Sequence, residues 1–210
     1  MKTENFSKTK IKICGLRRRE DILAVNEANP DYCGFIVEFP KSFRSVTADE
    51  VRELVKNLSP EIQPVGVFVN ASMELVRSLL DDGTLAMAQL HGQENESYIA
   101  ELKAHTDKPV IKAFSIKTEE DVKSAIRSEA DYILLDQGAG GTGETFDWSL
   151  VPSIKRPWFL AGGLGCDNLE TAIKMLHPWA VDLSSSVETD GHKDPDKIVK
   201  AVQTLSLIHI

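Results

Sequence analysis

Several short apolar runs of the sequence end in side chains that can move protons. Lys12 and Cys14 lie two residues apart in the run IKICG, so in a β-strand both would face the same way. A lysine ammonium group beside a cysteine favours the thiolate, which can act as a base or a nucleophile. Asp136 ends the run DYILLD and His91 follows a run at AMAQLHG. Both side chains can donate or accept a proton, so these four residues are candidates for acid–base chemistry.

Other segments carry groups that bind anions. Lys41 and Arg44 follow an apolar run in FPKSFR, and an arginine can pair bidentately with a carboxylate. Two segments of small residues could hold a phosphate through backbone N–H groups and hydroxyl groups. They contain Gly162, Gly163, Ser184, Ser185 and Ser186.

Each of these residues also has a structural role open to it. A lone Cys14 can be a small buried hydrophobe, and Asp136 can cap its own loop. His91 can be satisfied by neighbouring hydrogen bonds, and Arg44 can be solvated. The Gly-Gly pair can make a tight turn, and the serines can cap a helix.

The elements that would position these residues alternate along the chain about every 25 residues. Eight strand–helix units in about 200 to 250 residues predict a single (β/α)8 TIM barrel covering residues 1–210, with active-site residues at the carboxyl ends of the strands. Residues 1–9 are polar and are expected to form an N-terminal extension. The expected strands are 11–15, 31–38, 64–70, 86–92, 109–114, 131–136, 158–163 and 180–185. The expected helices are 19–28, 48–58, 72–80, 95–105, 118–126, 147–155, 167–176 and 194–205.

A glycine pattern typical of dinucleotide-binding turns follows the sixth expected strand. Gly138, Gly140 and Gly143 spell G-x-G-x-x-G, but such turns open a helix directly and are followed by an acidic residue at the end of the next strand. Here the next helical segment is short and contains Pro152, and the next strand ends in Ala-Gly-Gly. We therefore expect a pliable loop that closes over a ligand, rather than a nucleotide site.

Composition narrows the class of protein further. The net charge is −8, which argues against a nucleic-acid partner. No apolar run is long enough for a membrane span. Three scattered cysteines suit reduced thiols in the cytoplasm, and no group of Cys and His has the spacing of a metal site.

The strand ends, in their order along the chain, resemble phosphoribosylanthranilate isomerase, a barrel enzyme of tryptophan biosynthesis. The matching segments run from the first strand to the last helix. They are KICG with ED (12–15, 20–21), GF…PKSFR (34–44), PVGVFVN (64–70), QLHG (89–92), LLD…GGTGETFDW (134–148), LAGGL…N (160–168) and VDLSSSVETDGHKDP (181–195).

The resemblance implies an Amadori rearrangement of N-(5-phosphoribosyl)anthranilate without cofactor or metal. It implies that Cys14 is the general base, that Asp136 is the general acid with a raised pKa, and that Arg44 holds the anthranilate carboxylate. Lys12 and His91 are further expected contacts of this small-molecule substrate. The phosphate would lie at the glycine and serine segments, and the enzyme would be a monomer or a homodimer.

Two departures from the family pattern bear on these expectations. Ser186 replaces the glycine of the usual SSGVE, so it would be strained if that position needs a positive φ. The segment before PKSFR is one residue longer than expected, which affects the placement of Arg44.

Two other functions remain open at this point. A histidine-pathway aminoaldose isomerase would carry a second phosphate loop after the third strand, where the sequence shows no Gly-Gly pair. A non-catalytic phosphate-binding barrel would not need both Cys14 and Asp136.

Overall fold

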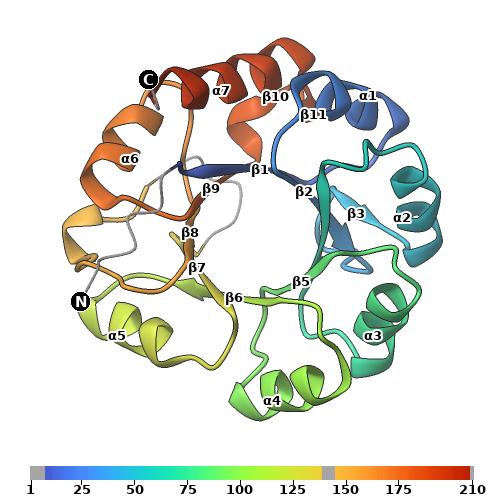
Figure 1. Ribbon diagram of the computed structural model, residues 1–210, viewed down its shortest axis with the longest axis horizontal. Helices are drawn as coiled ribbons and strands as arrows, with labels where there is room; N and C mark the ends of the chain where they lie inside the picture. The colour runs from blue at the N-terminus through green and yellow to red at the C-terminus, as the bar shows by residue number, and fades with distance from the viewer. Residues whose placement is uncertain (1–7, 139–144, 209–210) are drawn as a thin grey trace.

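The computed structural model describes residues 8–138 and 145–208, and its centre is a closed barrel of eight parallel strands (Figure 1). Each strand pairs with the next around the barrel, and β1 closes it by pairing with both β2 and β9. The barrel strands are β1 (Lys10–Cys14), β2 (Tyr32–Val37), β4 (Gln63–Phe68), β5 (Met87–Leu90), β6 (Val110–Ser115), β7 (Tyr132–Asp136), β8 (Trp158–Leu160) and β9 (Ala180–Leu183). The predicted TIM barrel is confirmed.

The helices form a ring outside the strands, and α7 lies beside α1 where the ring closes (Figure 1). Their starts follow local sequence signals. Thr47 and Glu50 form a capping box at α2, and Thr118 and Asp121 form one at α5, which satisfies backbone N–H groups of the first turn. The helices are α1 (Arg19–Ala28), α2 (Ala48–Val55), α3 (Met73–Asp81), α4 (Glu96–His105), α5 (Glu119–Arg127), α6 (Leu169–Leu176) and α7 (Pro195–Ile208).

The connection between β7 and β8 differs from the prediction. Of the helix expected over 147–155, the structure has only the 3₁₀ turn η1 (Trp148–Leu150). Asp147 accepts a hydrogen bond from Ser149 N at its start, and Pro152 disfavours a helical residue before it and lacks an N–H group. Residues 139–144, which include Gly140 and Gly143 of the expected closing loop, lie outside the described residues.

Side-chain alternation along the strands separates two apolar layers. One layer lies between the barrel and the helices and includes Ile13, Phe35 and Leu135. The other fills the barrel interior and includes Tyr32 and Phe159, whose rings meet edge to face. Polar side chains follow these inner residues toward the carboxyl ends of the strands, so the apolar interior forms the floor of the site.

Three smaller elements and the N-terminal segment complete the chain. β3 (Ser45–Val46) pairs in parallel with the last two residues of β2. The 3₁₀ turn η2 (Ser185–Val187) leads into the hairpin of β10 (Glu188–Thr189) and β11 (His192–Lys193). Of the expected extension 1–9, residues 1–7 are outside the described part. Thr9 is buried against the barrel, where its hydroxyl donates to Pro178 O at 3.0 Å.

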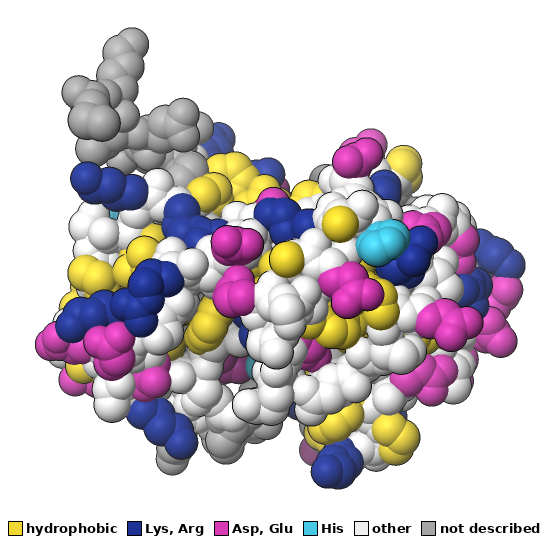
Figure 2. Space-filling model, turned by 90° about the horizontal axis from the view of Figure 1, so that it is seen from below, with side chains coloured by type: hydrophobic (Ala, Val, Ile, Leu, Met, Phe, Trp, Pro, Cys, Tyr) yellow, Lys and Arg dark blue, Asp and Glu magenta, His cyan; other side chains and the backbone are white. Residues whose placement is uncertain are grey.

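The outer surface carries charges of both signs. Figure 2 shows acidic and basic side chains interspersed over one face of the molecule, with apolar side chains scattered among them. Among the described residues, no helix is long and apolar enough to cross a membrane.

Candidate active site

A cavity of about 440 Å³ lies where the barrel strands reach their carboxyl ends. The sequence candidates converge there from six different strands and the segments that follow them. Those that line the cavity are Cys14, Lys41, Arg44, His91, Asp136, Gly162, Gly163, Ser184, Ser185 and Ser186. The side chains of residues far apart in the chain therefore face one common space.

Lys12 is the exception among the predicted contacts. Its side chain is fully buried below the cavity, where Nζ donates to Asp182 Oδ2 at 2.7 Å. Both strands that carry this pair, β1 and β9, are neighbours, and Lys12 is the register partner of Asp182. Lys12 therefore has no surface for a ligand and acts through the groups around it.

Cys14 and Lys12 share the inner face of β1, as their spacing predicted. A Cβ added to Gly34 on the neighbouring strand would lie 2.7 Å from Cys14 Sγ and 3.2 Å from Lys12 Nζ. Only a glycine on β2 leaves room for both groups, so this residue keeps the thiol and the ammonium group together inside the barrel.

The protonation of Cys14 differs from the expected thiolate. Burial raises the pKa of its thiol above the ordinary value of 9.0, and the charge of Lys12 acts in the opposite direction without offsetting it. The Lys12 ammonium is already paired with Asp182, and this partner raises the pKa of Lys12 against the effect of burial. In the free protein, Cys14 is therefore a neutral thiol at neutral pH.

This state predicts a thiolate titration at alkaline pH. The ultraviolet absorbance of the Cys14 thiolate, taken as wild type minus Cys14→Ser, is expected to grow only above pH 9.0, because burial disfavours the charged form. A titration near neutral pH would show instead that Lys12 stabilises the thiolate more than burial opposes it.

Asp136 contacts His91 at the β5 end, and His91 in turn contacts Gln89. His91 Nε2 lies 3.4 Å from Asp136 Oδ2, and Gln89 Nε2 lies 2.9 Å from His91 Nδ1. A Gln89 amide that donates to Nδ1 leaves the imidazole proton on Nε2, facing the carboxylate. His91 is thus oriented toward Asp136 by a side chain that is itself buried.

The carboxyl group of Asp136 also differs from the expectation of a raised pKa. Burial alone would raise it, but hydrogen bonds from His91 and from the backbone N–H groups of Gln137 and Gly138 hold the pKa below its ordinary value of 3.8. These donors stabilise the charged form. In the free protein, Asp136 is therefore a carboxylate.

The glycine and serine segments form one rim of the cavity. A Cβ at Gly162, whose φ is 84°, would lie 2.8 Å from Asp136 Oδ1, so this residue must stay small beside the carboxylate. Ser184 Oγ donates to Cys14 O at 3.1 Å, which joins the β9 end to the β1 end. The segments after β8 and β9 are neighbours, as a phosphate site between them requires.

Ser186 shows none of the strain considered for a serine in place of glycine. It lies in η2 and is not among the residues with positive φ. In the longer segment before Arg44, Glu38 directly follows β2 and adopts φ 49°. Its backbone N–H still donates to Val46 O, and Arg44 reaches the cavity.

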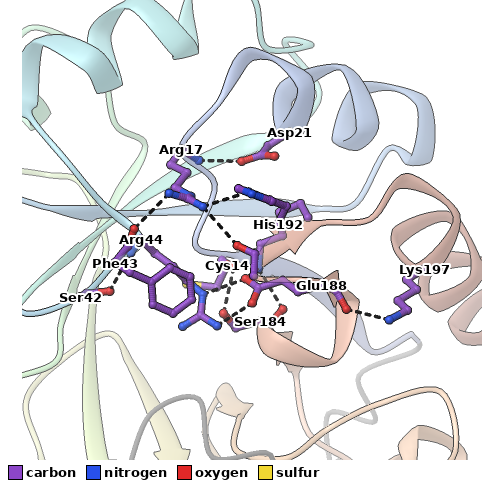
Figure 3. A network of polar contacts seen from close by, with 12 residues as sticks. Cys14, Arg17, Asp21, Ser42, Phe43, Arg44, Ser184, Glu188, His192 and Lys197 are labelled. Atoms are coloured by element: carbon purple, nitrogen blue, oxygen red, sulfur yellow. Dashed lines mark hydrogen bonds and ion pairs between the residues drawn. The ribbon is translucent and has the colours of Figure 1, made fainter.

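Arg44 is held by residues that the sequence did not single out. Its Nε and Nη2 each donate to a carboxylate oxygen of Glu188 at 2.7 Å (Figure 3). Lys193 Nζ donates to the same carboxylate at 2.7 Å. The ring of Phe43 covers the guanidinium group, with Cζ 4.2 Å from its centroid. Phe43, Phe39 and Val69 add apolar walls to this side of the cavity.

Three polar residues of the site were not among the predicted candidates: Asp182, Glu188 and Lys193. Gln89 appeared at a predicted strand end, within QLHG, but was given no role. Asp182 and Gln89 had a usable signal, because each lies two residues before a candidate and hence on its face of the strand. Glu188 and Lys193 lie on a short hairpin whose position the strand pattern does not give. Among the described residues, no group of three or more His, Cys, Asp or Glu side chains could hold a metal ion.

The sequence profile of N-(5′-phosphoribosyl)anthranilate (PRA) isomerases matches residues 11–204. The chain belongs to this family. An N-(5′-phosphoribosyl)anthranilate isomerase from Endomicrobium trichonymphae is 45% identical over 200 residues, or 93% of this chain and 98% of that protein.

Solved structures of the family have the same fold. The phosphoribosyl anthranilate isomerase of Thermotoga maritima superposes with a TM-score of 0.85 at 35% identity, covering 94% of this chain and 98% of that one. A phosphoribosyl anthranilate isomerase in complex with reduced 1-(o-carboxyphenylamino)-1-deoxyribulose 5-phosphate gives a TM-score of 0.83 at 34% identity, with the same coverage.

Proposed function

We propose that this chain converts N-(5′-phosphoribosyl)anthranilate to 1-(2-carboxyphenylamino)-1-deoxyribulose 5-phosphate, with Asp136 as general acid and Cys14 as general base. The observation that carries the proposal is that both side chains line one cavity from strands separated by two others in the barrel order. A sugar held between them would meet an acid on one side and a base on the other.

The ends of the substrate would be held by different rims of the cavity. The phosphate would bind to Gly162, Gly163 and the segment Ser184–Ser186, and Arg44 would pair with the anthranilate carboxylate. The aromatic ring would lie against Phe39 and the other apolar walls. Binding both ends places the reacting sugar carbons between Asp136 and Cys14.

The reaction would then proceed in three steps. Asp136 protonates the furanose ring oxygen, and the C1–O bond breaks as the nitrogen lone pair forms an iminium group. Cys14 takes the proton from C2, which the iminium has acidified, and the electron pair forms the C1–C2 double bond of an enolamine. Protonation at C1 and loss of the hydroxyl proton from O2 give the ketone, so no net redox change occurs and side chains suffice.

Before the first step, one proton must move from the Cys14 thiol to the Asp136 carboxylate. Cys14 is a thiol and Asp136 a carboxylate, whereas the first step needs the opposite arrangement with the same total number of protons. A bound substrate would displace water from Asp136, and this desolvation favours its protonated form. His91, whose Nε2 faces the carboxylate, keeps that carboxyl group oriented toward the cavity.

We further propose that the protein works in the cytoplasm on this small substrate, as a monomer or a homodimer. The cysteines support the cytoplasm as the compartment. Cys14, Cys33 and Cys166 are free thiols, and the proposed base Cys14 is inactive once oxidised.

The direct test is turnover by the purified wild-type protein. The fluorescence of the anthranilate adduct formed from anthranilate and ribose 5-phosphate is expected to disappear faster with the protein than in buffer. Equal rates with and without protein would reject the proposed function.

A further inference from the structure

Contacts with neighbouring residues hold the Arg44 side chain in one orientation. Its two hydrogen bonds to Glu188 form a bidentate pair in which the side chains are only 11% and 7% exposed. The ring of Phe43 covers one face of the guanidinium group (Figure 3). Below it, a Cβ on Gly15 would lie 2.6 Å from Arg44 Cδ, so the aliphatic stem rests on bare backbone.

This arrangement leaves one edge of the guanidinium group unused. The bonds to Glu188 use Nε and Nη2, and no hydrogen bond among the described residues uses Nη1. An arginine has five N–H donors in a fixed fork. The edge formed by Nη1 and the outer N–H of Nη2 can therefore take a second carboxylate, and Arg44 lines the cavity.

Arg44 and Lys193 together carry one more positive charge than Glu188 neutralises. Lys193, whose side chain is 1% exposed, binds the same carboxylate and also donates to Ser184 O at 2.9 Å. Burial acts to raise the pKa of Glu188, but hydrogen bonds from Arg44 and Lys193 lower it to about 2, so the group is an anion at working pH. Two cations and one anion give the cluster a net charge of +1.

The hairpin that carries Glu188 is tied to the segment that carries Arg44. Arg17 donates to Gly191 O at 3.2 Å and to Phe43 O at 3.3 Å, and lies 3.0 Å from His192 Nδ1 (Figure 3). The backbone on both sides of the Arg44–Glu188 pair is therefore held by a third segment.

We infer that Glu188 is a positioning residue that turns the free edge of Arg44 toward the cavity, so that the site prefers an aryl amine bearing a carboxylate. Lys193 complements it by balancing the Glu188 charge, which leaves the charge of Arg44 for the ligand. The inference rests on the proposed function, because it takes Arg44 as the group that binds the anthranilate carboxylate.

The test compares two ligands by calorimetry. One is reduced 1-(o-carboxyphenylamino)-1-deoxyribulose 5-phosphate, and the other is the same compound without the carboxyl group. Glu188→Gln is expected to weaken binding of the first ligand about tenfold, because Arg44 is then no longer oriented to pair with the carboxylate of the ligand. Binding of the second should change by less than about twofold. In turnover, KM should rise while kcat stays close to the wild-type value.

Two further variants separate positioning from charge and from folding. Glu120→Gln removes an acid paired with Arg127 on the exposed surface and should change neither affinity. The double variant Glu188→Gln/Lys193→Met removes one anion and one cation, so the cluster keeps its net +1 and no buried lysine loses its partner. It should still bind the carboxylated ligand as weakly as Glu188→Gln does.

Equal losses for both ligands in Glu188→Gln would show a merely structural role and overturn the inference. So would unchanged affinity for the carboxylated ligand, or its full recovery in the double variant. A wild-type protein that binds neither ligand would overturn the proposed function together with the inference.

Discussion

Asp136→Asn is expected to lower kcat/KM for N-(5′-phosphoribosyl)anthranilate by about two to four orders of magnitude. The amide has nearly the shape of the carboxyl group, and its one oxygen can still accept some of the hydrogen bonds that His91 and the backbone give to Asp136, so the fold should persist. It cannot deliver a proton to the ring oxygen, which must leave for the iminium to form. The fluorescence assay measures the rate, and thermal unfolding checks the fold.

The matched control for this variant is Asp107→Asn. Asp107 is exposed on the segment before β6, at the opposite end of the barrel, and its replacement should leave turnover unchanged. A near-wild-type rate in Asp136→Asn would remove Asp136 from the mechanism.

Cys14→Ser is expected to reduce turnover by a comparable factor, about two to four orders of magnitude. A serine hydroxyl nearly matches the shape of the thiol, but it is a far weaker acid, so its conjugate base is not populated. Proton removal from C2 should then limit the rate. A substrate deuterated at C2 should therefore react more slowly than the protiated one in this variant.

The same isotope comparison distinguishes the two roles. In Asp136→Asn, ring opening should limit the rate, and the isotope effect should be small. Cys33→Ala serves as the control for Cys14→Ser, because Cys33 is a buried thiol on β2 that packs in the layer between barrel and helices. An isotope effect that is large only in Asp136→Asn would reverse the two assignments.

Local sequence rules predicted the parts of the site that depend on neighbours in the chain. The two-residue spacing of Lys12 and Cys14 placed them on one face, since side chains alternate along a strand. The helix expected over 118–126 begins where Thr118 and Asp121 form a capping box at the start of α5. The barrel followed from the repetition of such elements, and its geometry gathered the strand ends.

The parts that were missed depend on contacts between distant segments. Lys12 meets Asp182 and Arg44 meets Glu188 only because the barrel closes and the last hairpin folds over the first strands. The expected pKa directions of Cys14 and Asp136 were wrong for a related reason. Both are set by burial and by hydrogen-bond donors that three-dimensional packing supplies.

The closure of the barrel by β1 and β9 also determines when the chain becomes a catalyst. Lys12 with Asp182, Cys14 with Ser184 and Arg44 with Glu188 each join the first quarter of the chain to its last thirty residues. Contacts of such long sequence separation form late, because the intervening loop entropy must be overcome first. A chain still emerging from the ribosome, even with most of its strands paired, therefore lacks a working site until its final segment docks.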